Sequence, residues 1–191
     1  MHHKTLAITF LSLVTALSSH AGGLQFHLRD TRGGVHTPAE WSGHKAVVLF
    51  FTTIDCPVAN SYVPEMNRIN ESYAPRGVLV YAVQADPTVA VADVTRYASD
   101  YRYAFPLLLD PTQVLVRLTD AKITPQAAIL TPDGRLLYLG RVDNRVVDFG
   151  KQRPQATVQD LRLALDAVLA GKPVPEPRTK SIGCAINRVQ P

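Results

Sequence analysis

Apolar positions along the chain form short continuous runs that alternate with helix-type periodic segments. Two runs, residues 46–51 and 78–83, are apolar almost throughout, which is typical of strands buried on both faces of a sheet. Between them, residues 58–73 place Met66 and Ile69 at helical spacing, which predicts an amphipathic helix interrupted by a proline. The pattern therefore predicts the order strand, helix, strand in the first half of the chain.

The second half continues this alternation. Further strands are predicted at residues 24–28, 35–41, 105–109, 126–130 and 136–142, and further helices at residues 89–101, from 110–112 to about 120, and at 157–170. Strands that alternate with helices, closed by a hairpin and a helix, predict an α/β fold. We expect a central mixed β-sheet flanked by helices, with an N-terminal hairpin and an extended C-terminal tail.

The first 21 residues have the pattern of a secretory signal peptide. A short positive segment precedes an apolar stretch at residues 6–17, and a small-x-small cleavage site ends at Ala21. The apolar stretch is too short to span a bilayer comfortably. We therefore expect cleavage after Ala21, export to the periplasm or beyond, and no membrane span in the mature chain.

Length, hydropathy and charge favour a single-domain protein and argue against a membrane-embedded or nucleic-acid-binding one. A chain of 191 residues suits one domain with a substantial core, here expected at residues 22–171, followed by a proline-rich tail at 172–191. Mean hydropathy is +0.01, which argues against a membrane-embedded body. The formal net charge of +4 has no block of like charges behind it, so nucleic acid is not an expected partner.

Cys56 lies at the corner between the first predicted central strand and the helix after it. The strand ends at two threonines, and Pro57 follows the cysteine, as is tolerated in the first turn of a helix. A thiolate at this place would face unpaired N–H groups and the positive end of the helix dipole, which stabilise the charged form. This context favours a reactive thiol; the alternative is an inert cysteine in the core.

Several local sequences together resemble a known family. They are Phe-Phe-Thr-Thr-Ile-Asp-Cys at residues 50–56, Pro64 eight residues later, Thr124-Pro125 opening a strand, and Leu-Thr-Pro-Asp-Gly at 130–134. With the element order, they resemble the thioredoxin fold and, more narrowly, the redoxin (AhpC/TSA-type) group of exported proteins. The resemblance covers residues 24–170.

The resemblance gives Thr124 and Pro125 a role. In the family, the proline at this position follows a cis peptide bond and lies beside the reactive cysteine. The backbone of Thr124 would then be free to pair with an extended substrate strand. The alternative is a trans proline that begins an edge strand.

The chain also departs from the thioredoxin pattern. The second cysteine of a CxxC motif is replaced by Ala59, so a disulfide within the motif is excluded. Asp55 stands where a tryptophan is usual, and its carboxylate should disfavour a neighbouring thiolate. Tyr62 stands where some exported reductases carry a glutamate for proton transfer, which puts that relay in doubt.

Peroxiredoxin features are incomplete. Thr53 matches the motif threonine, but Leu49 replaces the motif proline, and the active-site arginine aligns with Pro125. Arg141 on the predicted hairpin could substitute only by reaching in from elsewhere. Without a positioned cation, the thiolate and the leaving group lose stabilisation.

A metal site is not expected. All six histidines lie at or before His44, and copper-binding relatives use two loop cysteines with a late histidine. Too few soft ligands remain for copper, so we expect no cofactor. His27, His36 and His44 are interpreted as surface residues of the N-terminal hairpin.

Cys184 lies in the tail, whose ending at residues 179–186 resembles that of a bacterial redoxin subgroup. The thirteen steps from Gly171 to Cys184 could span up to about 40 Å, enough to return to the Cys56 corner. We predict that Cys56 is the attacking thiol and that Cys184 resolves the resulting mixed disulfide or sulfenic acid. The alternatives are a static structural disulfide and two unpaired cysteines.

These observations predict an exported thiol–disulfide oxidoreductase. Its partners would be exported protein thiols or disulfides, with an external thiol as electron donor. Two alternatives stay open: a thiol peroxidase that uses the same residues on peroxide, and a non-catalytic thioredoxin-like module that binds an exported partner through the groove at Pro125.

Overall fold

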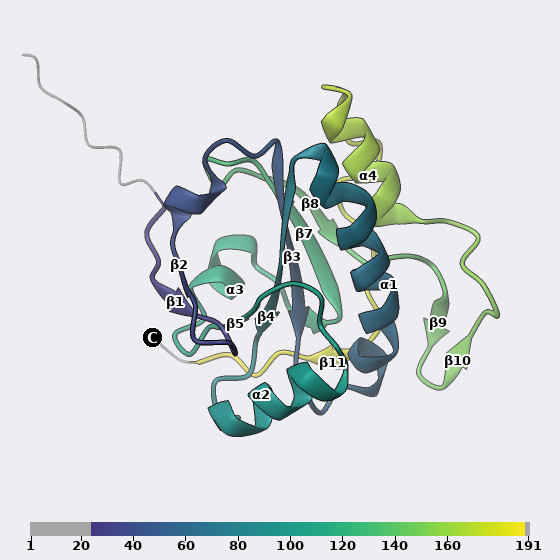
Figure 1. The fold of residues 1–191 in the computed structure, drawn as a ribbon. Helices are drawn as coiled ribbons and strands as arrows, with labels where there is room; N and C mark the ends of the chain where they lie inside the picture. Colours follow the sequence, from purple (N-terminus) through teal and green to yellow (C-terminus); the bar gives the residue numbers. More distant parts are fainter. Residues whose placement is uncertain (1–23, 190–191) are drawn as a thin grey trace, which may run out of the picture.

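The computed structural model describes residues 24–189, and the predicted signal peptide lies outside them (Figure 1). Its centre is a five-stranded sheet in the order β5-β4-β3-β7-β8. The strands are β3 (Ala46–Thr52), β4 (Val78–Gln84), β5 (Leu107–Leu109), β7 (Gln126–Leu130) and β8 (Leu136–Gly140). Strand β3 pairs parallel with β4 and antiparallel with β7, so the predicted mixed sheet is confirmed.

Helices cover both faces of this sheet (Figure 1). They are η1 (Pro38–Trp41), α1 (Pro57–Tyr73), η2 (Ala74–Arg76), α2 (Val91–Asp100), α3 (Val114–Thr119) and α4 (Asp160–Leu169). Every residue of β3 is buried, and neighbouring residues of a strand point to opposite faces. Phe50 therefore packs with the helices α1, α2 and α4, and Phe51 packs with η1 and α3.

The N-terminal hairpin is shorter than predicted. Its strands are β1 (Leu28–Arg29) and β2 (Val35–His36), of two residues each. The predicted strand at residues 35–41 is wrong beyond His36, because Pro38 has no N–H for a ladder and instead begins η1. That turn of helix carries Trp41 into the core, where it is fully buried.

The helix predicted to start at residues 110–112 begins later, at Val114. Gln113 adopts a left-handed conformation with φ of +54°, which separates Pro111 from the helix. The buried carboxylate of Asp110 accepts hydrogen bonds from the backbone N–H groups of Val114, Leu115 and Val116. The Asp110 side chain thus satisfies free N–H groups at the start of the helix, and Pro111, contrary to the prediction from the sequence, does not lie in its first turn.

Four short strands were not predicted: β6 (Ile123–Thr124), β9 (Val146–Asp148), β10 (Lys151–Gln152) and β11 (Cys184–Ala185). The β9–β10 hairpin projects beside α1 (Figure 1). The tail, yellow in Figure 1, returns across the domain, and β11 pairs antiparallel with β6. Within residues 24–189, none of the helices has the length and apolarity that crossing a bilayer requires.

Candidate active site

Cys56 is the N-cap residue of α1, at the predicted corner. Its backbone is extended, with φ of −94° and ψ of 103°, and Pro57 opens the helix. The backbone N–H of Ala59 donates to the Cys56 sulfur at 3.4 Å. The first N–H groups of a helix have no partner within the helix, and an N-cap side chain accepts from one of them; here that acceptor is the Cys56 sulfur.

Thr124 and Pro125 lie directly beside this sulfur. The peptide bond between them is cis, as the resemblance implied. The Cys56 thiol donates a hydrogen bond to the carbonyl oxygen of Thr124 at 2.9 Å. Both Cys56 and Thr124 are fully buried, so the contact is shielded from water.

Cys184 reaches the same place from the tail. In the β11–β6 ladder it is the direct partner of Thr124, and the backbone N–H of Ile186 donates to the carbonyl oxygen of Lys122 at 2.9 Å. Both cysteines are free thiols in this structure. The structure therefore brings Cys56, Thr124, Pro125 and Cys184 together.

A glycine makes this approach possible. A Cβ atom on Gly183 would lie 2.0 Å from the carbonyl oxygen of Thr124, which is far inside contact distance. That oxygen is the same one that accepts the Cys56 thiol hydrogen bond. Any side chain at position 183 would thus force the tail away from the site.

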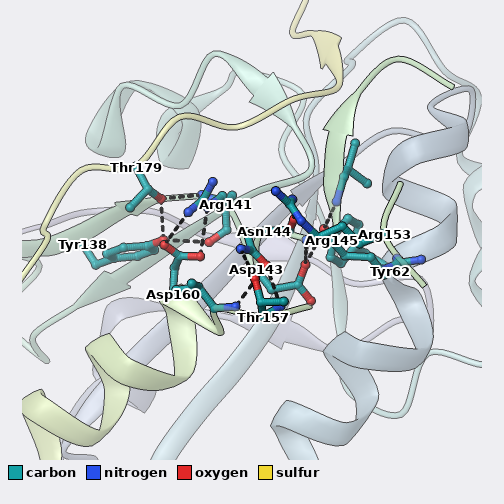
Figure 2. Close-up of polar contacts among 12 residues, drawn as sticks. Tyr62, Tyr138, Arg141, Asp143, Asn144, Arg145, Arg153, Thr157, Asp160 and Thr179 are labelled. Carbon is teal, nitrogen blue, oxygen red and sulfur yellow. Dashed lines mark hydrogen bonds and ion pairs between the residues drawn. The ribbon is translucent and has the colours of Figure 1, made fainter. Parts of the chain in front are cut away.

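Arg141 is engaged in holding the tail (Figure 2). Its guanidinium forms two hydrogen bonds with the Asp160 carboxylate, at 2.9 and 3.0 Å. Its backbone N–H donates to the hydroxyl of Thr179 at 3.0 Å, and that hydroxyl also lies 2.7 Å from the Tyr138 hydroxyl. The role considered for Arg141, a cation reaching in toward the cysteine, gains no support from this pairing with Asp160.

Tyr62 belongs to a neighbouring network (Figure 2). Its hydroxyl donates to Asp143 at 2.6 Å, and the guanidinium of Arg145 lies 4.5 Å from the centre of its ring. Burial and the Asp143 carboxylate raise the pKa of Tyr62, so its phenol stays protonated at neutral pH. Tyr62 ties α1 to the loop before β9.

Thr53 and Asp55 lie in the turn before the cysteine. The carbonyl oxygen of Thr53 accepts a hydrogen bond from the Cys56 backbone N–H at 3.2 Å. Asp55 is exposed, so water screens its carboxylate from the buried sulfur. The repulsion expected from the sequence is therefore weakened by solvent.

Sequence reasoning missed a buried polar group centred on Tyr97. The Tyr97 hydroxyl donates to the side-chain oxygen of Asn60 at 2.9 Å and lies 3.0 Å from the Tyr103 hydroxyl. Burial raises the pKa of Tyr97, and the charge on Cys56 adds to this effect. Asn60 could have been found, because it lies one helical turn after Cys56, but Tyr97 comes from a separate helix.

The Cys184 thiol is harder to ionise than an ordinary cysteine. Burial raises the pKa of Cys184, and the hydrogen bond with the Cys56 side chain and the charge there raise it further. Only the thiolate attacks a disulfide, so the raised pKa lowers the fraction of Cys184 that is in the reactive form.

We therefore expect Cys56→Ser to move the pH profile of Cys184 alkylation to lower pH. The substitution removes the charge on Cys56 but not the burial, so the pKa of Cys184 should fall part of the way back. The measurement is the alkylation rate of Cys184 against pH, followed by mass spectrometry of the peptide. Superimposable profiles for the two proteins would show that the two side chains do not interact.

Comparisons with known proteins bear on the family and the fold. The AhpC/TSA family model matches residues 23–139. A hypothetical protein from Sinorhizobium meliloti is 29% identical with a TM-score of 0.73, over 88% of this chain and 95% of that one. No match was found among curated proteins.

Two more distant structures are similar in fold. The exposed lipoprotein thioredoxin of Streptococcus pneumoniae is 21% identical with a TM-score of 0.54, over 60% of this chain and 87% of that one. A secreted Mycobacterium tuberculosis disulfide oxidoreductase, described as homologous to Escherichia coli DsbE, is 21% identical with a TM-score of 0.51, over 78% and 96%. These likenesses confirm the predicted thioredoxin-like fold. Since the AhpC/TSA model matches more than half of this chain, the chain belongs to the AhpC/TSA family, a thioredoxin-like redox family.

Proposed function

We propose that the protein is an exported thiol–disulfide oxidoreductase in which Cys56 attacks and Cys184 resolves. One observation carries this proposal: both cysteines meet at Thr124. The Cys56 thiol donates to the Thr124 carbonyl oxygen at 2.9 Å, and Cys184 is the strand partner of the same residue. Two free thiols that meet at a helix start are suited to forming and breaking a disulfide.

In the first step, the Cys56 thiolate attacks one sulfur of a substrate disulfide. A bond forms between Cys56 and that sulfur, and the other substrate sulfur leaves as a thiolate and takes up a proton. The N–H of Ala59, 3.4 Å from the Cys56 sulfur, supports the negative charge before the attack.

In the second step, the Cys184 thiolate attacks the Cys56 sulfur. The Cys56–Cys184 disulfide forms, and the substrate leaves as its second thiol, so the substrate has gained two electrons and two protons. An external dithiol in the compartment to which the protein is exported then reduces the Cys56–Cys184 disulfide. Burial raises the pKa of Cys184 most, and the Cys56 side chain raises it further; oxidation of Cys56 removes this second contribution, which supports the order of events.

Peroxide is a less well supported substrate. Pro125 occupies the position of the peroxidase arginine, and Arg141 is paired with Asp160. A peroxide oxygen leaving from Cys56 would therefore lack the positioned cation that such chemistry uses.

The proposal predicts a reversible Cys56–Cys184 disulfide. Mild oxidation of the purified chain should remove two hydrogen atoms and join the two cysteine peptides in mass spectrometry. Titration against a thiol buffer should give a reduction potential above about −300 mV, as expected of an exchanging pair. Two free thiols after oxidation would rule out the paired mechanism, and a potential well below that value would indicate a structural disulfide.

A further inference from the structure

The segment between Thr179 and Asn187 is anchored at both ends. On one side, the Thr179 hydroxyl accepts from the backbone N–H of Arg141, and the backbone N–H of Leu139 donates to the carbonyl oxygen of Pro177. On the other side, the Gln113 side chain donates to the carbonyl oxygen of Asn187 at 2.6 Å. The segment therefore lies over the body of the protein as a strap.

The centre of the strap, residues 181–185, is held weakly, whereas Ile186 at its end is buried in the core. Strand β11 contributes two residue pairs to β6, which is the minimum for a ladder. The Ser181 hydroxyl is buried, and within residues 24–189 it has no hydrogen-bond partner, which costs part of the free energy of docking. Firm anchors and a weak centre allow residues 181–185 to lift while Ile186 and the rest of the tail stay in place.

The strap covers Cys56. Cys56 is fully buried, and its thiol donates to the carbonyl oxygen of Thr124. Gly183 lies against that same oxygen, and Cys184 faces Thr124 across the ladder. An extended polypeptide that paired with Thr124 would need the same backbone groups that β11 now uses. The tail and such a polypeptide therefore exclude each other.

We propose that residues 181–185 occupy the chain's own substrate groove in the manner of a bound polypeptide. This inference rests on the proposed function, and it names the substrate class. The groove takes an extended polypeptide whose cysteine is preceded by glycine, and it takes this polypeptide only after the strap has lifted. Glycine is selected because the residue before the cysteine lies on the Thr124 carbonyl oxygen, where a Cβ atom has no room.

Because the strap and the substrate use the same groove, resolution of the Cys56–substrate disulfide is coupled to release of the substrate. When the strap returns, Cys184 attacks the Cys56 sulfur, the mixed disulfide breaks, and the substrate leaves as a thiol. The returning β11 strand takes the backbone of Thr124 at the same time. The substrate then loses its covalent bond and its strand partner in one event.

The first test measures access to Cys56 in the reduced full chain. Gly183→Ala changes the strap, and Gly140→Ala changes the body, where a Cβ atom would lie 2.0 Å from the Thr179 hydroxyl. We expect both variants to raise the alkylation rate of Cys56 about tenfold, because the closed state loses population. Ala92→Ser, at an exposed position on α2 outside the tail and the groove, is the control and should leave the rate unchanged. A wild-type rate in Gly183→Ala would overturn the inference, even if the protein is an active oxidoreductase.

The second test measures selection of glycine. The probe is a peptide with the sequence of residues 180–187, whose cysteine carries a thionitrobenzoate leaving group, and a second peptide has alanine in place of glycine. With Gly140→Ala/Cys184→Ser protein, Cys56 should displace thionitrobenzoate from the glycine peptide about tenfold faster. Equal rates would overturn the inference and leave the proposed function standing. Failure of Cys56 to react with either peptide or with a small aromatic disulfide would instead overturn the proposed function.

Discussion

Cys56→Ser is expected to abolish thiol–disulfide exchange, and Cys184→Ser is expected to stop it halfway. A serine hydroxyl is hardly ionised at neutral pH, so the first variant lacks a nucleophile and should lose at least about a thousandfold in rate. The second variant retains Cys56 at the start of α1 with the N–H of Ala59 directed at its sulfur. It should therefore complete the attack and then accumulate the Cys56–substrate mixed disulfide.

The measurement is the refolding of a protein with scrambled disulfides, combined with mass spectrometry of species trapped by acid. Ala92→Ser introduces the same residue at an exposed position on α2, away from both cysteines, and serves as the control. Peroxide consumption that depends on Cys56, without disulfide exchange, would indicate a thiol peroxidase. Unchanged behaviour of Cys56→Ser in the cell would instead favour a binding module that uses its cysteines as a staple.

The parts of this fold that the sequence predicts are those with a strong local pattern. Strands β3 and β4 are apolar almost throughout, and α1 repeats apolar residues at helical spacing, so their burial could be inferred without the structure. The corner at Cys56 followed for the same reason, because a strand, a proline and a helix are neighbours in the chain. Local pattern and tertiary structure agree at these places.

The parts that could not be predicted depend on contacts between distant residues. Strand β11 has two residues, too few for any periodicity, and its partner Thr124 lies far back in the chain. The need for glycine at position 183 exists only because the Thr124 carbonyl oxygen lies against it. The length of the tail allowed Cys184 to return toward Cys56, but length alone does not give the strand register that faces it toward Thr124.

The same distinction explains the misplaced helix start at residue 110. Pro111 follows an aspartate, a pattern that is common at helix starts, but the left-handed Gln113 intervenes. The side chain of Gln113 is bound to the carbonyl oxygens of Ala85 and Asn187. Contacts with Ala85, the residue after β4, and with the tail therefore fix Gln113 here, and local propensity does not decide where α3 begins.

The strand that delivers Cys56 should also be a main source of stability. Phe50→Ala is expected to lower the free energy of unfolding by about 3–5 kcal/mol, the usual range for truncating a fully enclosed phenylalanine. Its ring lies 5.9 Å from that of Phe105, between β3 and the helices on one face, so truncation leaves a cavity that the surrounding sheet cannot fill. The measurement is urea unfolding of the reduced full chain.

Phe149→Ala is the matched control, because that ring is 62% exposed on the β9–β10 hairpin. It should change the free energy of unfolding by no more than about 0.5 kcal/mol. A similarly small change for Phe50→Ala would mean that the ring is not enclosed between β3 and the helices. In that case the sheet would not hold Cys56 rigidly at the start of α1, and the positioning on which the exchange mechanism depends would have to come from the tail.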